Sequence, residues 1–143
     1  MNHSRRLFGV PVHPLLVHFP IVFWLTVPLL DLAILLDGPN PWWNLAQAAT
    51  LAGLAFGAAA LLFGFLDYRD PKLAGIDLRL AARHGVRTSL AWCAFTVRAV
   101  LAALLPLSTA TLVLSLTIDL IGCALLLQGV VLGTRQIYDQ LEQ

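Results

Sequence analysis

Three of the four histidines in this sequence lie beside long apolar runs, and their side chains are well suited to chemistry. His13 and His18 belong to the segment HPLLVHFP, which opens the first run, and His84 precedes the third run. Apolar runs that cross a membrane in alternating directions bring all three imidazoles to the same side at a similar depth. Imidazole is the commonest metal ligand and a carrier of protons near neutral pH. We therefore expect a cofactor site at one edge of the bilayer.

The composition is that of a membrane protein. The hydrophobic fraction of 59% and the charged fraction of 12% exclude an ordinary soluble domain, in which roughly a quarter of residues are charged. A spanning helix needs about 20 apolar residues. The short connections after the first and third runs favour antiparallel hairpins. With no internal repeat evident, we expect one all-α domain over residues 1–143, an up-down bundle of four transmembrane helices at 14–36, 44–66, 84–107 and 109–133.

The basic residues predict how the bundle is oriented. The connections at 37–44 and 105–109 carry no Lys or Arg. By the positive-inside rule, both termini and the middle connection are cytoplasmic. The first run is too long for a signal peptide and lacks a small-residue cleavage site, so we expect a retained helix. Helical spacing of Leu73, Ile76 and Leu80 predicts a short amphipathic helix in the middle connection. The basic residues outside the apolar runs are Arg5, Arg6, Arg69, Lys72, Arg79, Arg83, Arg87 and Arg135.

Three charged residues fall inside the apolar runs, where each costs about 2.5–3.5 kcal/mol. Arg98 is long enough to reach Asp31 or Asp119, so we expect one buried ion pair or a triad. One interpretation is that this pair fixes the register of the bundle, and the other is a proton or electron path. His84 and Arg98 are about 40° apart on a helical wheel, so both can face the interior. Cys93, about 180° from His84, should point outward, and we expect no disulfide with the second cysteine.

Small residues form stripes on the second and fourth helices. Gly53 and Gly57 make a GxxxG pair on the second, and Gly129 and Gly133 lie on a comparable stripe of the fourth. Such stripes allow close helix packing, and they also provide a flat wall for a planar macrocycle. Besides the lipid bilayer, the expected partner is another membrane protein or a second copy bound through these glycines. The net charge of +1 gives no reason to expect nucleic acid.

The histidines suggest a haem site. His13 and His18 are about 140° apart and cannot comfortably bind one metal from the same face of a helix. Axial ligation of haem needs one imidazole from each of two facing helices, and His18 with His84 is the best such pair. Arg83 and Arg87 flank His84 at the edge where haem propionates need cations.

Other roles for the same group remain open. His13 and Asp67 would orient an imidazole or carry its proton in a haem site. Alternatively, His13, His18, His84 and Asp67 form a mixed nitrogen–oxygen site for iron, zinc or copper. A third interpretation has no cofactor, with the histidines tying helix ends together by hydrogen bonds.

Four segments resemble a bacterial family of predicted four-helix membrane proteins, catalogued as domain of unknown function number 2231. They are His13-Pro14, VHFPI at 17–21, GFLDY at 64–68, and His84. The resemblance spans nearly the whole chain, and HPxxVHFP is its most specific motif. It implies a small protein of the bacterial inner membrane, suspected of haem binding or redox work. It also implies that His13, His18, Asp67 and His84 are the residues to watch.

These observations give three functional hypotheses. The first is an electron-transfer protein that binds haem b and exchanges electrons with a quinone or a membrane partner. The second is a non-enzymatic accessory subunit of a larger respiratory or photosynthetic complex. The third is a metal-dependent membrane enzyme or ion carrier that uses the same four residues. Whether the protein is an enzyme is left open by the sequence.

Overall fold

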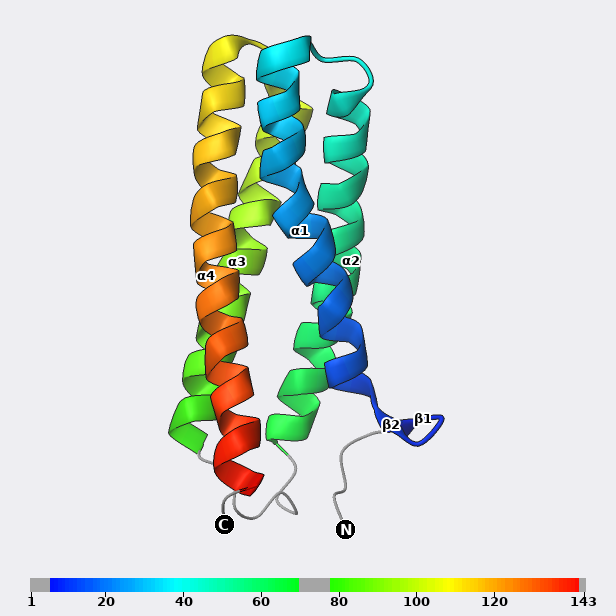
Figure 1. Cartoon of the computed structure of the whole chain (residues 1–143), viewed down its shortest axis with the longest axis vertical. Coiled ribbons are helices and arrows are strands. Elements are labelled where there is room, and N and C mark those ends of the chain that lie inside the picture. The colour runs from blue at the N-terminus through cyan, green and yellow to red at the C-terminus, as the bar shows by residue number, and fades with distance from the viewer. Residues whose placement is uncertain (1–5, 70–77, 142–143) are drawn as a thin grey trace.

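The computed structural model is a four-helix bundle (Figure 1) and describes residues 6–69 and 78–141, with side chains at 8–69 and 78–135. A small antiparallel hairpin, β1 (Arg6–Leu7) and β2 (Val10–Pro11), precedes the bundle. The start of α1 and the end of α4 lie at the same end of the bundle, as an up-down topology requires. The helices are α1 (Val12–Asp37), α2 (Trp42–Tyr68), α3 (Leu78–Leu104) and α4 (Thr109–Leu141).

The helix boundaries differ from the expected ones mainly in α3 and α4. Helix α3 begins at Leu78 instead of residue 84, because its first turns carry arginines that a search for apolar runs passes over. It ends at Leu104 instead of residue 107, since Pro106 disfavours helical backbone at the residue before it. Helix α4 continues to Leu141, beyond the expected end at residue 133. Of the expected surface helix, Leu73 and Ile76 lie outside the described residues, and Leu80 belongs to α3.

All four helices are long and apolar enough to cross a membrane. Large apolar side chains are exposed on the outside of every helix, including Val22, Leu51, Val97 and Leu120. An exterior of this kind is unfavourable in water and suits lipid. The expected fold, a four-span all-α membrane bundle, is therefore confirmed.

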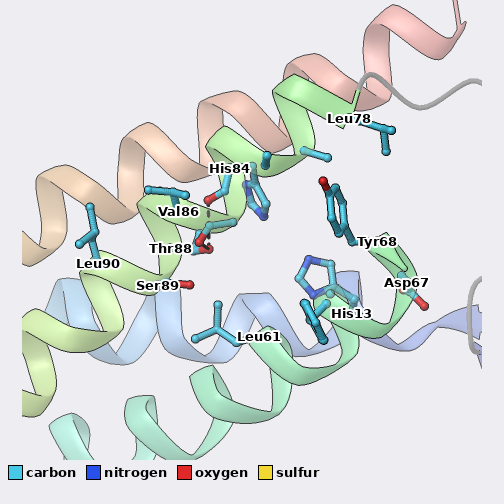
Figure 2. A pocket seen from close by; sticks show the side chains of 15 residues that line it. His13, Leu61, Asp67, Tyr68, Leu78, His84, Val86, Thr88, Ser89 and Leu90 are labelled. Carbon is cyan, nitrogen blue, oxygen red and sulfur yellow. Dashed lines mark hydrogen bonds between the residues drawn. The ribbon is translucent and has the colours of Figure 1, made fainter. Parts of the chain in front are cut away.

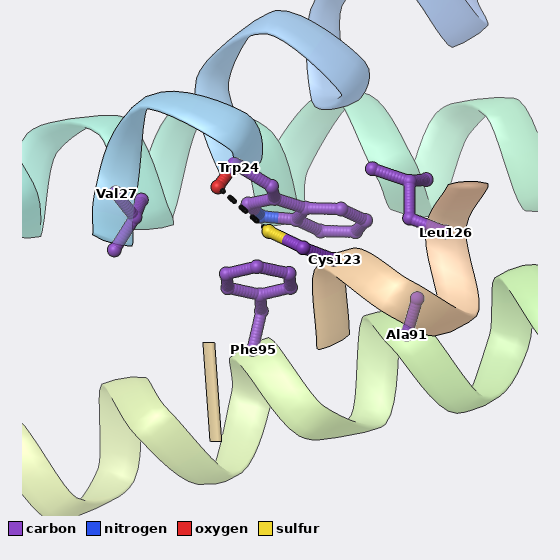
Figure 3. Close-up of a cluster of buried hydrophobic side chains, with 6 residues drawn as sticks. All are labelled: Trp24, Val27, Ala91, Phe95, Cys123 and Leu126. Carbon is purple, nitrogen blue, oxygen red and sulfur yellow. Dashed lines mark hydrogen bonds between the residues drawn. The ribbon is translucent and has the colours of Figure 1, made fainter. Parts of the chain in front are cut away.

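Two stacked aromatic rings form the centre of the core (Figure 3). The rings of Trp24 on α1 and Phe95 on α3 lie 4.6 Å apart between centroids, with an angle of 6° between their planes. Each ring lies against a glycine-bearing helix: Trp24 covers Gly53 and Gly57 on α2, and Phe95 covers Gly122 on α4. The small residues thus make room for the rings within the bundle.

A thiol satisfies the backbone where α1 contains a proline. Pro28 has no N–H, so the carbonyl of Trp24, four residues earlier, has no helical hydrogen bond to accept. The Sγ atom of Cys123 on α4 lies 3.4 Å from that oxygen and donates to it. Cys123 is buried, Cys93 is exposed as the helical wheel predicts, and both are free thiols.

The two hairpins, α1–α2 and α3–α4, repeat one another, although no repeat is evident in the sequence. When 71 is added to the residue numbers of α1, His13 corresponds to His84 of α3. The same shift relates three buried residues of α1 to three buried residues of α3: Pro20, Trp24 and Val27 correspond to Ala91, Phe95 and Arg98. A shift of 69 takes the five buried residues of α2 to buried residues of α4: Ala46, Thr50, Gly53, Gly57 and Ala60 correspond to Ser115, Asp119, Gly122, Leu126 and Gly129. Helices α1 and α3 start at the same end of the bundle, and α2 and α4 end there. The two hairpins therefore form a parallel repeat, whose pseudo-twofold axis runs along the bundle. The repeat is not evident in the sequence because the pattern of burial repeats while most residue types do not.

Candidate functional site

Two imidazoles from different hairpins meet at the end of the bundle where α1 and α3 begin. The ring centroids of His13 and His84 lie 6.1 Å apart, and their planes are at 86° to each other. Figure 2 shows the two rings on facing sides of one pocket, one from α1 and the other from α3. Because the shift of 71 residues relates these two positions, the imidazoles lie on either side of the pseudo-twofold axis.

Each imidazole is held by a backbone carbonyl of the partner helix in its own hairpin. The Nδ1 atom of His13 lies 2.8 Å from the oxygen of Ala60. The Nδ1 atom of His84 lies 2.7 Å from the oxygen of Gly129. A carbonyl oxygen only accepts hydrogen bonds, so each Nδ1 carries a proton. In the neutral ring, the lone pair is therefore on Nε2, which is the atom left to bind a ligand.

A glycine one turn after each carbonyl lets the imidazole lie against the helix. A Cβ atom at Gly64 would be 2.8 Å from Cε1 of His13, closer than real Cβ contacts allow. A Cβ atom at Gly133 would be 3.0 Å from Nδ1 of His84. The shift of 69 residues also relates these two glycines. The carbonyl and the glycine together fix the position and tautomer of each ring.

Beside the imidazoles is a pocket of about 650 Å³ lined by residues of α2 and α3. Its volume lies within the range of about 300–1,000 Å³ that is typical of small-molecule sites. Small residues (Gly64, Ala81, Ala82 and Gly85) provide the space, and most of the remaining lining is apolar. The polar lining residues besides the histidines are Asp67, Tyr68, Thr88 and Ser89.

The structure brings together three of the four residues expected at the site. His13, His84 and Asp67 line one pocket, but His18 is exposed and does not line it. The expected pair of His18 and His84 is thus replaced by His13 and His84. The reason is that α1 already begins at Val12, so His13 is helical and lies about 20° on a helical wheel from the buried Trp24, on the inward face. His18, about 140° further round the same helix, then points outward.

The expected cations are also placed differently. Arg83 and Arg87 are exposed and do not line the pocket. Arg69, at the end of α2, lies beside it, with its guanidinium carbon 5.5 Å from the ring centroid of Phe65, a lining residue. Phe65, Thr88 and Ser89 were not predicted as site residues, and their positions follow from the faces that α2 and α3 turn toward each other.

The pocket does not hold a complete set of protein ligands for a metal ion. Among the described residues, no three side chains of His, Cys, Asp or Glu form a group that would hold a metal. The mixed nitrogen–oxygen site of His13, His18, His84 and Asp67 is therefore not assembled in this structure. What the structure offers is a pair of imidazoles and a cavity beside them.

A second polar cluster, Arg98 with Asp31, Asp119 and Gln47, lies in the half of the bundle away from the histidines. The Nη2 atom of Arg98 lies 2.9 Å from Oδ1 of Asp31, and its Nε atom lies 3.6 Å from Oδ2 of Asp119. Its Nη1 atom donates to Oε1 of Gln47 over 2.7 Å. The three charged side chains are fully buried. The triad considered from the sequence is therefore present.

The glycines expected to bind a partner are covered by the chain itself. Gly53 and Gly57 pack beneath Trp24, and Gly129 packs beneath Thr88. Gly133 packs beneath His84. These contacts use the glycine stripes to position side chains within the bundle.

A family match covers almost the whole of this architecture. Residues 9–140 match the family described as "Predicted membrane protein (DUF2231)". The chain therefore belongs to this family of predicted membrane proteins. No curated protein and no solved structure matched the chain significantly.

Proposed function

We propose that this member of the DUF2231 family binds one haem b between His13 and His84 and carries electrons in the bacterial inner membrane. The observation that carries the proposal is the pair of facing imidazoles beside a pocket of about 650 Å³. Each ring has its Nδ1 proton engaged by a carbonyl, which leaves Nε2 for an axial ligand bond. Haem, when bound, supplies one-electron chemistry, and the protein sets its position and potential.

The distance between the rings fits a metal held by both. Two metal–nitrogen bonds of about 2.0–2.1 Å, with an imidazole beyond each, place the ring centroids roughly 6 Å apart when the bonds are collinear. The observed distance between centroids is 6.1 Å. Two imidazoles leave four positions of an octahedral iron to other ligands, and the four nitrogens of a porphyrin would fill them. This set suits haem better than a bare metal ion, for which the described residues provide no group of three ligands.

The surroundings of the imidazoles suit a haem ligand pair. The hydrogen bonds from Nδ1 to the carbonyls of Ala60 and Gly129 fix the ring orientation and leave Nε2 as the free ligand atom. Small and apolar residues line the pocket where a macrocycle would lie. Arg69, beside Phe65, replaces Arg83 and Arg87 as the proposed partner of the propionates.

The orientation of the protein follows from its arginines. Arg69, Arg79, Arg83 and Arg87 all belong to the end of the bundle that holds the histidines. By the positive-inside rule, we infer that this end and both termini are on the cytoplasmic side. The proposed haem would then exchange electrons with a partner near the cytoplasmic surface.

The absorption spectrum of the purified full-length protein tests the proposal. We expect a Soret band, and sharp α and β bands after reduction with dithionite. His13→Ala or His84→Ala should abolish the spectrum of the six-coordinate haem. His18→Ala is the matched control, because this imidazole is exposed and does not line the pocket. It should leave the spectrum unchanged.

Two results would contradict the proposal. A haem spectrum that depends on His18 instead of His13 would restore the pair expected from the sequence. A colourless protein, still colourless after titration with haemin and free of bound metal, would leave the two imidazoles as ties between helices. The accessory-subunit hypothesis would then be the better one.

A further inference from the structure

We propose that the charge cluster of Arg98, Asp31 and Asp119 is a proton-binding site, with one exchangeable proton that resides on Asp119. This site is separate from the histidine pocket, and none of its residues lines that pocket. Its ligand is a single proton, which converts the Asp119 carboxylate into a neutral carboxylic acid.

The charges of the cluster do not balance without a bound cation. Arg98 contributes one positive charge, and Asp31 and Asp119 contribute two negative charges when both are ionised. All three side chains have no exposed surface. A net charge buried in an apolar bundle is costly, and such groups usually become neutral by binding or losing a proton. One proton on either carboxylate makes the cluster neutral.

The neighbours from the other helices do not supply the missing positive charge. Helix α2 contributes Gln47 and Thr50, both uncharged, and the Thr50 hydroxyl already donates to the carbonyl of Ala46. Helix α4 contributes the buried Ser115, one turn before Asp119. The ring of Trp43, at the start of α2, lies 5.8 Å from the guanidinium carbon of Arg98 and is also neutral.

The hydrogen bonds indicate which carboxyl group holds the proton. Oδ1 of Asp31 accepts a charge-assisted hydrogen bond of 2.9 Å from Arg98, which favours the ionised form of Asp31. Among the described residues, neither oxygen of Asp119 has a hydrogen-bond partner, and its ion-pair distance to Arg98 is 3.6 Å. An ionised carboxylate without hydrogen bonds in an apolar interior is unfavourable, whereas a protonated one gains a donor. Asp119 is therefore the better place for the proton.

The O–H group of a protonated Asp119 has a hydrogen-bond acceptor nearby. Oδ2 of Asp31 is buried and has no hydrogen-bond partner in the part of the chain that the structure describes. Both carboxyl groups approach the same guanidinium group, so a proton on Asp119 would face a free acceptor in the same cluster. Two carboxyl groups that share one proton in this way are a recognised device for holding it.

Infrared spectroscopy of the purified full-length protein tests this proposal, and the test needs no haem. At pH 7 we expect the C=O stretch of a protonated carboxylic acid, shifted when H₂O is exchanged for D₂O. Asp119→Asn should remove the band, because Asp31 alone balances Arg98. Asp31→Asn should also remove it, because Asp119 then ionises as the only counter-ion. Asp119→Glu should keep the band and move its frequency.

The matched control is Asp37→Asn, which removes an exposed carboxylate at the end of α1 and should leave the band unchanged. Absence of the band from the wild-type protein would overturn the proposal. A sodium ion that balanced the charge in place of the proton would give this result. Survival of the band in Asp119→Asn, or an unmoved band in Asp119→Glu, would also overturn it. Asparagine has nearly the shape of a protonated aspartate, so Asp119→Asn should fold.

Discussion

The two hairpins hold their histidines in the same way. In α1–α2, His13 donates to the carbonyl of Ala60 and packs on Gly64. In α3–α4, His84 donates to the carbonyl of Gly129 and packs on Gly133. The same two hairpins differ in the other half of the bundle. There, Val27 of α1 corresponds to Arg98 of α3, and Thr50 of α2 corresponds to Asp119 of α4.

This difference separates two kinds of site. Matched residues on either side of a pseudo-twofold axis suit a ligand that lies on the axis and is held equally from both sides. Unmatched residues make contacts that exist only once, such as the single guanidinium with its two carboxylates. Such contacts fix which helix faces lie together, a role best attested for buried polar residues in coiled coils. The bundle thus uses symmetry near the histidines and asymmetry near the charges.

The largest expected effect on stability comes from replacing Arg98 with the residue found at the corresponding position of the other hairpin. Arg98→Val places in α3 the residue that α1 has at the corresponding position, and it leaves two buried carboxyl groups without their cation. We expect a loss of about 3–5 kcal/mol in the free energy of unfolding. Reversible unfolding in mixed micelles measures this loss.

The matched control for that variant completes the symmetry. Adding Asp31→Ala and Asp119→Thr gives the charged half the residues of the opposite hairpin at the three positions, with no buried charge left. Most of the lost stability should return, since well-packed apolar replacements of buried ion pairs are often neutral or better. A triple variant as unstable as Arg98→Val alone would show that these residues stabilise the bundle in another way.

A smaller effect is expected from the glycines that carry the imidazoles. Gly64→Ala puts a methyl group 2.8 Å from a carbon of His13, and Gly133→Ala puts one 3.0 Å from a nitrogen of His84. Each should cost about 1–3 kcal/mol of stability through overpacking, Gly64→Ala the more. Gly85→Ala, in α3 with no atom within 4 Å of the added carbon, is the control and should be neutral or slightly stabilising. Equal stabilities for all three variants would contradict the close packing of the rings.

The smallest effect concerns the thiol that bonds the carbonyl freed by Pro28. Cys123→Ala removes the hydrogen bond to Trp24 and should cost about 0.5–1.5 kcal/mol in the free energy of unfolding. Cys93→Ala changes an exposed thiol and should stay within about 0.5 kcal/mol of the wild type. A larger loss for Cys93→Ala than for Cys123→Ala would rule out this contribution.

The fold could be predicted from the sequence because apolar length decides where a helix can cross a membrane. The ends of α3 were harder, since arginines in its first turns are helical without being apolar. The grouping of Arg98 with Asp31 and Asp119 followed from their shared depth in the spans. The contact of His13 with His84 did not follow, because the helix expected from the apolar run begins at residue 14, after His13, whereas α1 begins at Val12.

The repeat was hidden for a different reason. Packing requires a small residue beneath each ring and an apolar or polar group of the right size elsewhere, and several residue types meet each requirement. Trp24 corresponds to Phe95, and Gly57 corresponds to Leu126, so the few identical pairs, such as Gly64 with Gly133, are too scattered to mark the repeat. Only the burial pattern and the paired contacts of the histidines reveal it.

The most direct test of the histidine pair is the electron paramagnetic resonance spectrum of the oxidised, haem-loaded protein. If His13 and His84 both hold the haem iron, the oxidised protein should give a low-spin signal. His13→Ala and His84→Ala should each remove that signal to the same extent, and His18→Ala should preserve it. A low-spin signal that survives in His13→Ala and disappears in His18→Ala would contradict a ligand held on the axis between the two hairpins.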